Sequence, residues 1–116
     1  MFRGEIWRLS TANQRQSADS GSGRLVVIVS SDALGTLPLK LIVPLTQWKE
    51  EYGRAPWMVR LPPVLHSGLD SAMAADALQV RSVSTARLAK RMGELPEEWV
   101  NQIAQAVALV MQGRHP

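Results

Sequence analysis

RLVVIVS, at residues 24–30, is the stretch that decides the fold. It is a continuous run of aliphatic, mostly β-branched residues, and such a run predicts a strand that is buried on both faces. The strand nevertheless begins with a charged residue, Arg24, directly after a Gly- and Ser-rich segment. Arg24 is therefore either an edge residue that keeps its charge in water while its stem packs, or part of a functional site.

Four further segments are expected to be strands around this one. Residues 4–9 and 56–63 alternate between polar and apolar side chains, which is the pattern of a half-buried strand. Residues 37–46 (LPLKLIVPLT) form another β-rich run, and Pro44 near its end predicts an edge strand or a bulge. Residues 74–83 (AADALQVRSV) read as a last, long strand.

One loop and two helices complete the expected organisation. Residues 10–23 are rich in Ser, Gly and Gln and lack large apolar groups, so we expect a flexible loop there. Residues 84–93 predict a short helix that begins at Ser84 as a cap and ends at Gly93. Residues 96–112 predict the C-terminal helix, because Pro and Glu open it and apolar residues then recur at helical spacing.

The length of 116 residues allows one domain and leaves no room for a second core. About five antiparallel strands with hairpin-sized connections, followed by one helix, predict a mainly β or α+β fold. We expect a small antiparallel barrel with a C-terminal helix, formed by residues 1–116 as a single domain.

Composition argues against several kinds of site. The chain has no cysteine, which excludes disulfides, thiolate catalysis and Cys-based zinc sites. Its two histidines, His66 and His115, lie far apart in the sequence, so we expect no metal site. No apolar run approaches the length of a membrane span, and we expect a cytoplasmic protein without membrane association. The net charge of +3 favours anionic partners only weakly.

Three polar residues occupy strand ends or faces where apolar residues are the norm: Arg24, Thr46 and Gln79. Each has an ordinary structural explanation. Thr46 can end a strand by capping its backbone, and Gln79 can face solvent from the last strand. The residue pattern by itself leaves both explanations open.

Four blocks of the sequence, taken in order, resemble the MazF/PemK family of toxins from bacterial toxin–antitoxin pairs. They are RGEIWRL, RLVVIVS, LIVPLT and DALQVRSVSTARLAKRMGEL, and together they cover nearly the whole chain. The resemblance implies a homodimer of SH3-like barrels that acts as a metal-independent, cofactor-free, sequence-specific endoribonuclease. Its expected partners are single-stranded RNA and a cognate antitoxin with a disordered C-terminal tail.

The resemblance also implies roles for individual residues. Arg24 matches the catalytic arginine that opens a strand, and Thr46 matches the threonine that assists it. Gln79 matches a glutamine that lines the RNA groove, with Arg81 and Ser82 beside it. The family's cleavage uses the ribose 2′-OH as nucleophile and leaves a 2′,3′-cyclic phosphate and a 5′-OH.

Two further RNA contacts are expected from residue type. Arg87 lies in VRSVSTARLAKR, a run with several basic residues and no acid, which is either a solvated helix face or a surface that follows phosphates. Trp48 follows the PLT block in a polar segment and can stack on an unpaired base, as can Tyr52.

The sequence departs from the family pattern at the expected base. The acidic residue that often precedes the glutamine is Leu78 here, and in a strand Asp76 shares the face of Leu78. His66 is the one plausible imidazole for this role, and we interpret it instead as a histidine in a turn between strands. No general base is therefore evident from the sequence.

Two alternatives stay open. The CcdB gyrase inhibitors share this barrel and dimer without performing chemistry, so a gyrase-binding toxin has the same expected fold. A weakened homologue kept as an interaction module is the second alternative, because the loop and the missing acid differ from the family. The combination of Arg24, Thr46 and Gln79 favours the nuclease.

Overall fold

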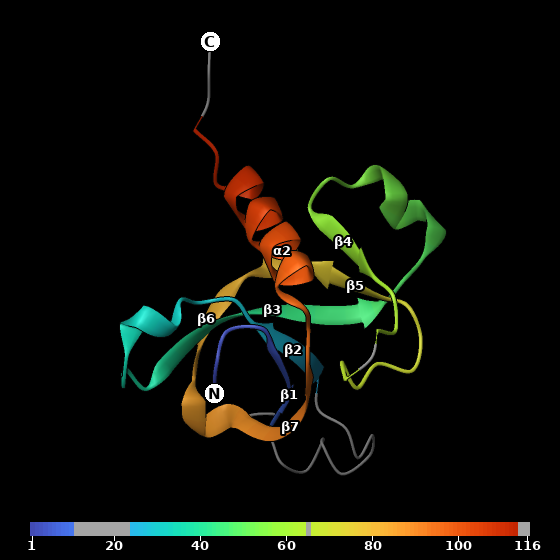
Figure 1. Cartoon of the computed structure of the whole chain (residues 1–116). Helices are drawn as coiled ribbons and strands as arrows, with labels where there is room; N and C mark the ends of the chain where they lie inside the picture. Colours follow the sequence, from blue (N-terminus) through green and yellow to red (C-terminus); the bar gives the residue numbers. More distant parts are fainter. Residues whose placement is uncertain (11–23, 65, 114–116) are drawn as a thin grey trace.

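Seven antiparallel strands and one long helix form the part of the chain described by the structure, a computed structural model that covers residues 1–10, 24–64 and 66–113 (Figure 1). Four short 3-10 turns connect the strands. The elements are β1 (Glu5–Leu9), β2 (Arg24–Ile28), η1 (Asp32–Leu34), β3 (Leu39–Gln47), η2 (Glu50–Arg54), β4 (Met58–Leu61), β5 (Met73–Asp76), η3 (Ala77–Gln79), β6 (Arg81–Ser84), η4 (Thr85–Arg87), β7 (Leu88–Glu94) and α2 (Glu97–Val110). The loop predicted over residues 10–23 lies, after Ser10, outside the described residues.

β3 is the central strand. One of its edges pairs with β2, and the other pairs with β6 through Leu39–Ile42 and with β5 through Leu45–Gln47. The strand order is β4-β5-β3-β2-β1-β7, and this sheet does not close, so the expected barrel is an open one. The prediction that Pro44 marks an edge or a bulge is wrong. Pro44 faces Val26 inside the sheet and falls in the step between β6 and β5 on the other edge, where no described residue is paired with it.

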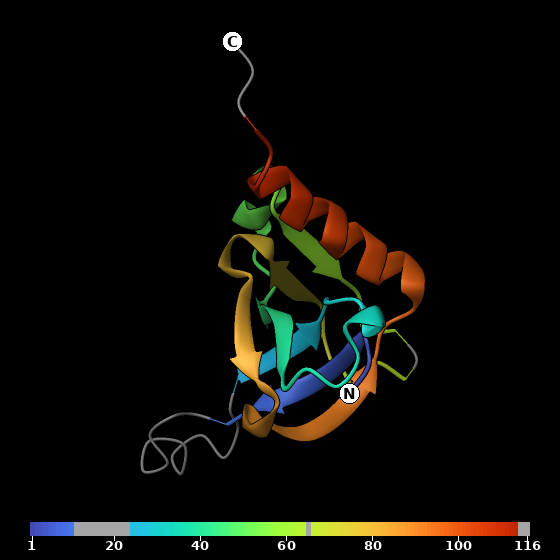
Figure 2. The same cartoon turned by 90° about the vertical axis from the view of Figure 1, so that its left-hand side faces the viewer.

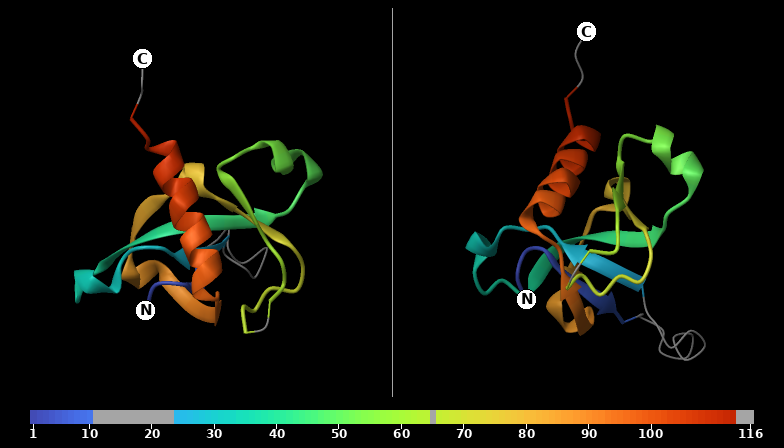
Figure 3. Two further views of the ribbon diagram at one scale, coloured as in Figure 1. Left: turned by 45° about the horizontal axis from the view of Figure 1, so that its top comes forward. Right: turned by 45° about the vertical axis from the view of Figure 1, so that its right-hand side comes forward.

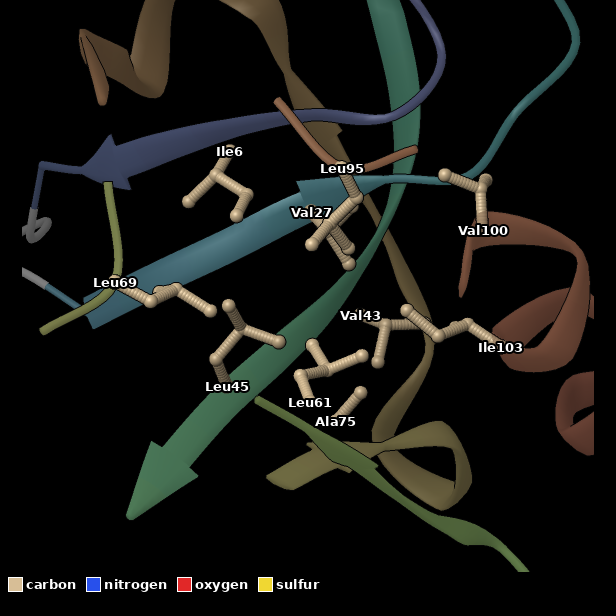
Figure 4. Packing of buried hydrophobic residues seen from close by; sticks show 10 residues of the cluster. All are labelled: Ile6, Val27, Val43, Leu45, Leu61, Leu69, Ala75, Leu95, Val100 and Ile103. Carbon is tan, nitrogen blue, oxygen red and sulfur yellow. The ribbon is translucent and has the colours of Figure 1, made fainter. Parts of the chain in front are cut away.

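Both faces of β2 are buried over Val26–Ile28, as the apolar run predicted, and so are both faces of β3 over Ile42–Leu45. Val27 and Val43 point into the larger core, whose other members include Ile6, Leu45, Leu61 and Ile103 (Figure 4). The opposite face carries a smaller core of Leu9, Val26, Ile28, Ile42, Val83 and Leu88.

The C-terminal helix predicted over 96–112 is confirmed as α2. Pro96 precedes its first turn, which carries Glu97 and Glu98, where negative charge suits the helix dipole. Figures 2 and 3 show α2 lying along one side of the sheet, and Val100 and Ile103 enter the larger core from it. Among the residues described, no helix has the length and apolar character needed to cross a membrane.

The long strand predicted over 74–83 is wrong in its middle. The chain forms β5 as far as Asp76, turns through η3, and resumes as β6 at Arg81. The break lets one segment serve two partners, because β5 pairs with the C-terminal half of β3 and β6 with its N-terminal half. Strand pairing to a single central strand therefore overrides the apparent continuity of the pattern.

The short helix predicted over 84–93 is also wrong. Ser84 does cap a turn, since its hydroxyl accepts a hydrogen bond from the Ala86 amide, but the turn is only the three residues of η4. The chain then continues as β7, which pairs with β1. Ala, Lys, Arg and Met are good helix formers, but intrinsic helix propensity is small, and the otherwise unpaired edge of β1 offers backbone hydrogen bonds that override it.

Candidate active site

The pairing of β2 with β3 brings Arg24 and Thr46 together. Val26 lies opposite Pro44 in this antiparallel pair. The paired part of β2 and β3 ends there, and Arg24 and Thr46 are the residues two positions further along each strand. Side chains two apart on a strand share a face, so Arg24 and Thr46 both project from the face that carries Val26 and Pro44. Both residues are exposed at this end of the pair.

A pocket of about 190 Å³ opens where Arg24 and Thr46 meet. Its wall is drawn from segments that are far apart in the sequence, on β2, β3, β4, β5, η2 and η3. The lining residues are Arg24, Pro44, Leu45, Thr46, Tyr52, Met58, Asp76 and Gln79. The pocket therefore contains the three polar residues singled out in the sequence, together with Tyr52, which was considered as a stacking surface, and the carboxylate of Asp76, which sequence reasoning had set aside.

The turn η3 explains why Asp76 and Gln79 both reach the pocket. One Asp76 carboxylate oxygen, Oδ1, accepts a hydrogen bond from the Leu78 amide at 3.2 Å, and Oδ2 accepts one from Gln79 Nε2 at 2.7 Å. A 3-10 turn has three residues per turn, so side chains at positions i and i+3 align. The expectation that Asp76 shares a face with Leu78 is therefore wrong, and Leu78 instead points to solvent with 58% of its surface exposed.

The pocket holds one cation and one anion from its lining residues. In the described part of the chain, neither Arg24 nor Asp76 takes part in an ion pair with another described residue. The remaining polar lining groups are the hydroxyls of Thr46 and Tyr52 and the amide of Gln79. A guanidinium, hydroxyls and an amide together suit an anionic, hydrogen-bonding ligand such as a phosphodiester.

Trp48 lies beside the pocket rather than in its wall. Its ring packs edge-on against Tyr52, with centroids 5.8 Å apart and planes at 76°. The guanidinium carbon of Arg60 lies 5.9 Å from the centre of the Trp48 ring. The aromatic pair thus extends the pocket outward, because Tyr52 lines it and Trp48 contacts Tyr52.

Arg81 and Ser82 lie towards the other end of β3. They are exposed on β6, opposite Ile42 and Leu41 respectively, and they do not line the pocket. Any RNA contact by these two residues therefore involves a surface that continues beyond the pocket.

Arg87 is engaged by the protein itself. Its Nη2 and Nε donate to the Ser10 carbonyl at 3.0 and 3.3 Å, and the Ser10 amide donates to the Arg87 carbonyl at 2.8 Å. These hydrogen bonds tie the residue after β1 to η4. Half-buried and occupied in this way, Arg87 has a structural role that the basic run in the sequence did not reveal.

His66 belongs to a different part of the molecule. It is exposed in a turn with φ at +68°, and its carbonyl accepts a hydrogen bond from the Glu94 amide at 2.8 Å. The cavity that it lines is bordered by Gly68 and by residues 91–96. The interpretation of His66 as a turn histidine between strands agrees with this placement.

Comparison with known proteins identifies the fold. Three solved structures similar to this chain are an endoribonuclease in complex with its cognate antitoxin from a mycobacterial species, the Mycobacterium tuberculosis toxin MazF-mt6, and a MazE-MazF complex from Deinococcus radiodurans. Their TM-scores are 0.74, 0.71 and 0.69, and their sequence identities 20%, 13% and 22%. The similarity covers 100%, 96% and 97% of this chain and 99%, 99% and 96% of theirs.

The family comparison is more specific. A search of curated proteins finds no match to this chain. Residues 2–111, however, match the family of PemK-like, MazF-like toxins of type II toxin–antitoxin systems. This match spans every described strand and the helix α2. The chain therefore belongs to the PemK-like, MazF-like toxins of type II toxin–antitoxin systems.

Proposed function

We propose that this toxin is a metal-independent, sequence-specific endoribonuclease that cleaves single-stranded RNA, with mRNA as its target in the cell. The observation that carries the proposal is the shared pocket of Arg24 and Thr46. Family membership supports it, as do the endoribonucleases among proteins of the same fold. The non-catalytic, CcdB-like alternative is not favoured, because the matching family is that of PemK and MazF.

In this proposal the substrate supplies its own nucleophile. The ribose 2′-OH attacks the adjacent phosphorus, the bond to the 5′-oxygen breaks, and the products carry a 2′,3′-cyclic phosphate and a 5′-OH. The protein has to stabilise the extra negative charge on the pentacoordinate phosphorus and to assist proton transfer. Neither task needs a protein nucleophile.

Arg24 and Thr46 suit the first task. The planar guanidinium of Arg24 offers several donors matched to two phosphate oxygens, and the Thr46 hydroxyl opposite it can donate to the same group. A preorganised donor of this kind contributes about 2.7–4 kcal/mol to transition-state stabilisation. Arg24 acts through charge and hydrogen bonding, since a guanidinium does not serve readily as a base.

RNA on either side of the scissile phosphate would use the surface around the pocket. Trp48 and Tyr52 offer ring faces and edges on which unpaired bases can stack, a contact worth about 1–3 kcal/mol per base. Gln79 at the rim and Arg81 with Ser82 on β6 would line the continuing groove. Arg87 would contribute indirectly by holding η4 against Ser10.

The proposed partners follow from the same reading. A cognate antitoxin would block the toxin with a disordered C-terminal tail that folds on binding.

The toxin itself would be a homodimer. Leu39 and Leu41, exposed at the N-terminal end of β3, and the part of α2 from Asn101 to Val110, which carries no charge, supply surface of the composition found in interface cores. An enzyme acting on mRNA would work in the cytoplasm.

One assay tests the activity. Purified protein is incubated in EDTA with a mixed-sequence RNA, beside Arg24→Ala and Arg24→Lys variants, and the ends of the products are mapped. We expect the wild type to leave 5′-OH ends at a defined sequence, Arg24→Ala to be inactive, and Arg24→Lys to be strongly impaired because lysine lacks the planar fork. Intact RNA together with inhibited gyrase would instead support the CcdB-like alternative.

A further inference from the structure

The proposed nuclease still needs a group to accept the proton of the attacking 2′-OH. The pocket of Arg24 and Thr46 has a single carboxylate among its lining residues, Asp76 at the end of β5. Sequence reasoning set Asp76 aside because an uninterrupted strand would have turned it with Leu78. The 3-10 turn η3 changes that geometry and brings Asp76 to the pocket.

We propose that Asp76 is the general base of this enzyme, and that Gln79 positions it. This assignment rests on the proposed nuclease activity. In the step, the proton of the 2′-OH moves to an Asp76 carboxylate oxygen as the 2′-oxygen bonds to phosphorus. The bond from phosphorus to the 5′-oxygen breaks, the leaving oxygen takes a proton from solvent, and Asp76 returns its own proton to water.

The contacts of Asp76 fit this role. Each carboxylate oxygen accepts one hydrogen bond, from the Leu78 amide at 3.2 Å and from Gln79 Nε2 at 2.7 Å. These two contacts fix the orientation of the carboxylate, and each oxygen keeps a lone pair for a substrate proton. Arg24 lies in the same pocket, so one phosphodiester can meet the guanidinium while its neighbouring 2′-OH meets the carboxylate.

The ionisable surroundings of Asp76 are few. Arg24 from β2 and Tyr52 from η2 are the other ionisable side chains that line the pocket, and Arg60 lies on the neighbouring strand β4. The helix α2, which contacts η3, has no ionisable residue from Asn101 to its end at Val110. An acid limb in the pH dependence of cleavage can therefore be traced to Asp76 by substitution.

A purely structural explanation exists, because Asp76 also caps η3. Asp76→Asn separates the two roles. Asparagine caps as well as aspartate, and the Gln79 amide can turn to meet it, but a carboxamide cannot accept the proton. Since general-base assistance is typically worth about 100- to 10,000-fold, we expect kcat/KM to fall by about 100-fold or more with the melting temperature unchanged.

Two further readouts distinguish a base from a cap. Cleavage by the wild type should fall at acidic pH, and Asp76→Asn should lose that limb. Gln79→Glu should move the limb to higher pH, because a second carboxylate disfavours the ionised form of its neighbour. Added formate or acetate should partly restore cleavage by Asp76→Ala, which a lost cap cannot explain.

The outcomes are separable. An Asp76→Asn variant that cleaves at the wild-type rate, or that keeps the wild-type acid limb, would overturn the assignment of Asp76 while leaving the nuclease activity standing. RNA that the wild type leaves intact at every site would overturn the nuclease activity and the assignment together.

Discussion

Thr46 contributes one hydroxyl to the pocket that Arg24 also lines, and its contribution can be isolated. The residue is exposed near the C-terminal end of β3, where it pairs with Ala74 of β5, so substitution should change the free energy of unfolding by less than about 0.5 kcal/mol. Thr46→Ala should lower kcat by about 100- to 1,000-fold, the usual effect of losing one transition-state donor. Thr46→Ser keeps the hydroxyl and serves as the control; wild-type cleavage by Thr46→Ala would remove Thr46 from the site.

Glu5 shows how a single carboxylate links stability to pH. Its side chain is 12% exposed, accepts from Trp7 Nε1 at 2.9 Å and pairs with Arg91 Nε at 3.2 Å. Burial alone would raise the pKa of Glu5, but hydrogen bonds from Trp7, from the Phe2 backbone and from Arg91, with the N-terminal charge, outweigh it. The net pKa lies below the ordinary value of 4.5.

A depressed folded-state pKa contributes stability that is present above the unfolded-state pKa and is lost as pH falls through the folded-state pKa. Glu5→Gln should therefore be less stable than the wild type at pH 7, by about 1–3 kcal/mol. The difference should shrink below about pH 4. Urea unfolding of both proteins between pH 3 and pH 7 measures it, and a difference that does not change with pH would argue against this linkage.

At this scale the sequence predicted most of the polar residues of the pocket. Arg24, Thr46 and Gln79 were marked by polarity at strand ends and by the family resemblance, and the structure brings them together. Tyr52 was considered only as a stacking surface, and Asp76 was set aside with Leu78, because its place in the pocket depends on a 3-10 turn. The spacing of three between Asp76 and Gln79 was the available signal, and it is informative only once a turn is assumed.

Among the elements, β2 and α2 were predictable for a simple reason. A continuous apolar run with both faces buried and an amphipathic repeat with an acidic first turn each have one favourable solution. For residues 74–93, two local structures were compatible with the pattern. Their alanines and basic residues are compatible with helix or strand, and the partner strands β3 and β1 decide the outcome. Pairing partners are not visible in a local pattern, which is why both predictions there failed.

The turn formed by His66 and Ser67 lies closely against the backbone of β7 at Gly93. A Cβ atom at Gly93 would clash with the backbone of Ser67, and the Glu94 amide next to it donates to the His66 carbonyl at 2.8 Å. Gly93→Ala should therefore destabilise the protein by about 1–3 kcal/mol or more, as overpacking does in a closely packed site.

The matched control for Gly93→Ala is Gly53→Ala. A Cβ atom at Gly53 would meet no atom within 4 Å. Chemical denaturation of the two variants and the wild type compares them directly. Equal stability of Gly93→Ala and Gly53→Ala would show that β7 tolerates a side chain at this position and that the close approach is not a constraint.

In the whole molecule, β3 links every functional part. Its side chains enter both cores, its N-terminal half pairs with β6, and its C-terminal half pairs with β5 and ends in the pocket. An antiparallel sheet with one C-terminal helix was predictable from the order of apolar runs. That the sheet stays open was not, because closure depends on the relative twist and pairing of edge strands rather than on any one segment.

The most direct test is a crystal structure of the protein with a single-stranded oligonucleotide that spans its mapped cleavage site and carries 2′-deoxyribose there to prevent reaction. The account predicts one phosphate within hydrogen-bond distance of both the Arg24 guanidinium and the Thr46 hydroxyl, with the 2′ position facing Asp76. A scissile phosphate bound elsewhere, with Arg24 and Thr46 contacting no common group, would contradict it.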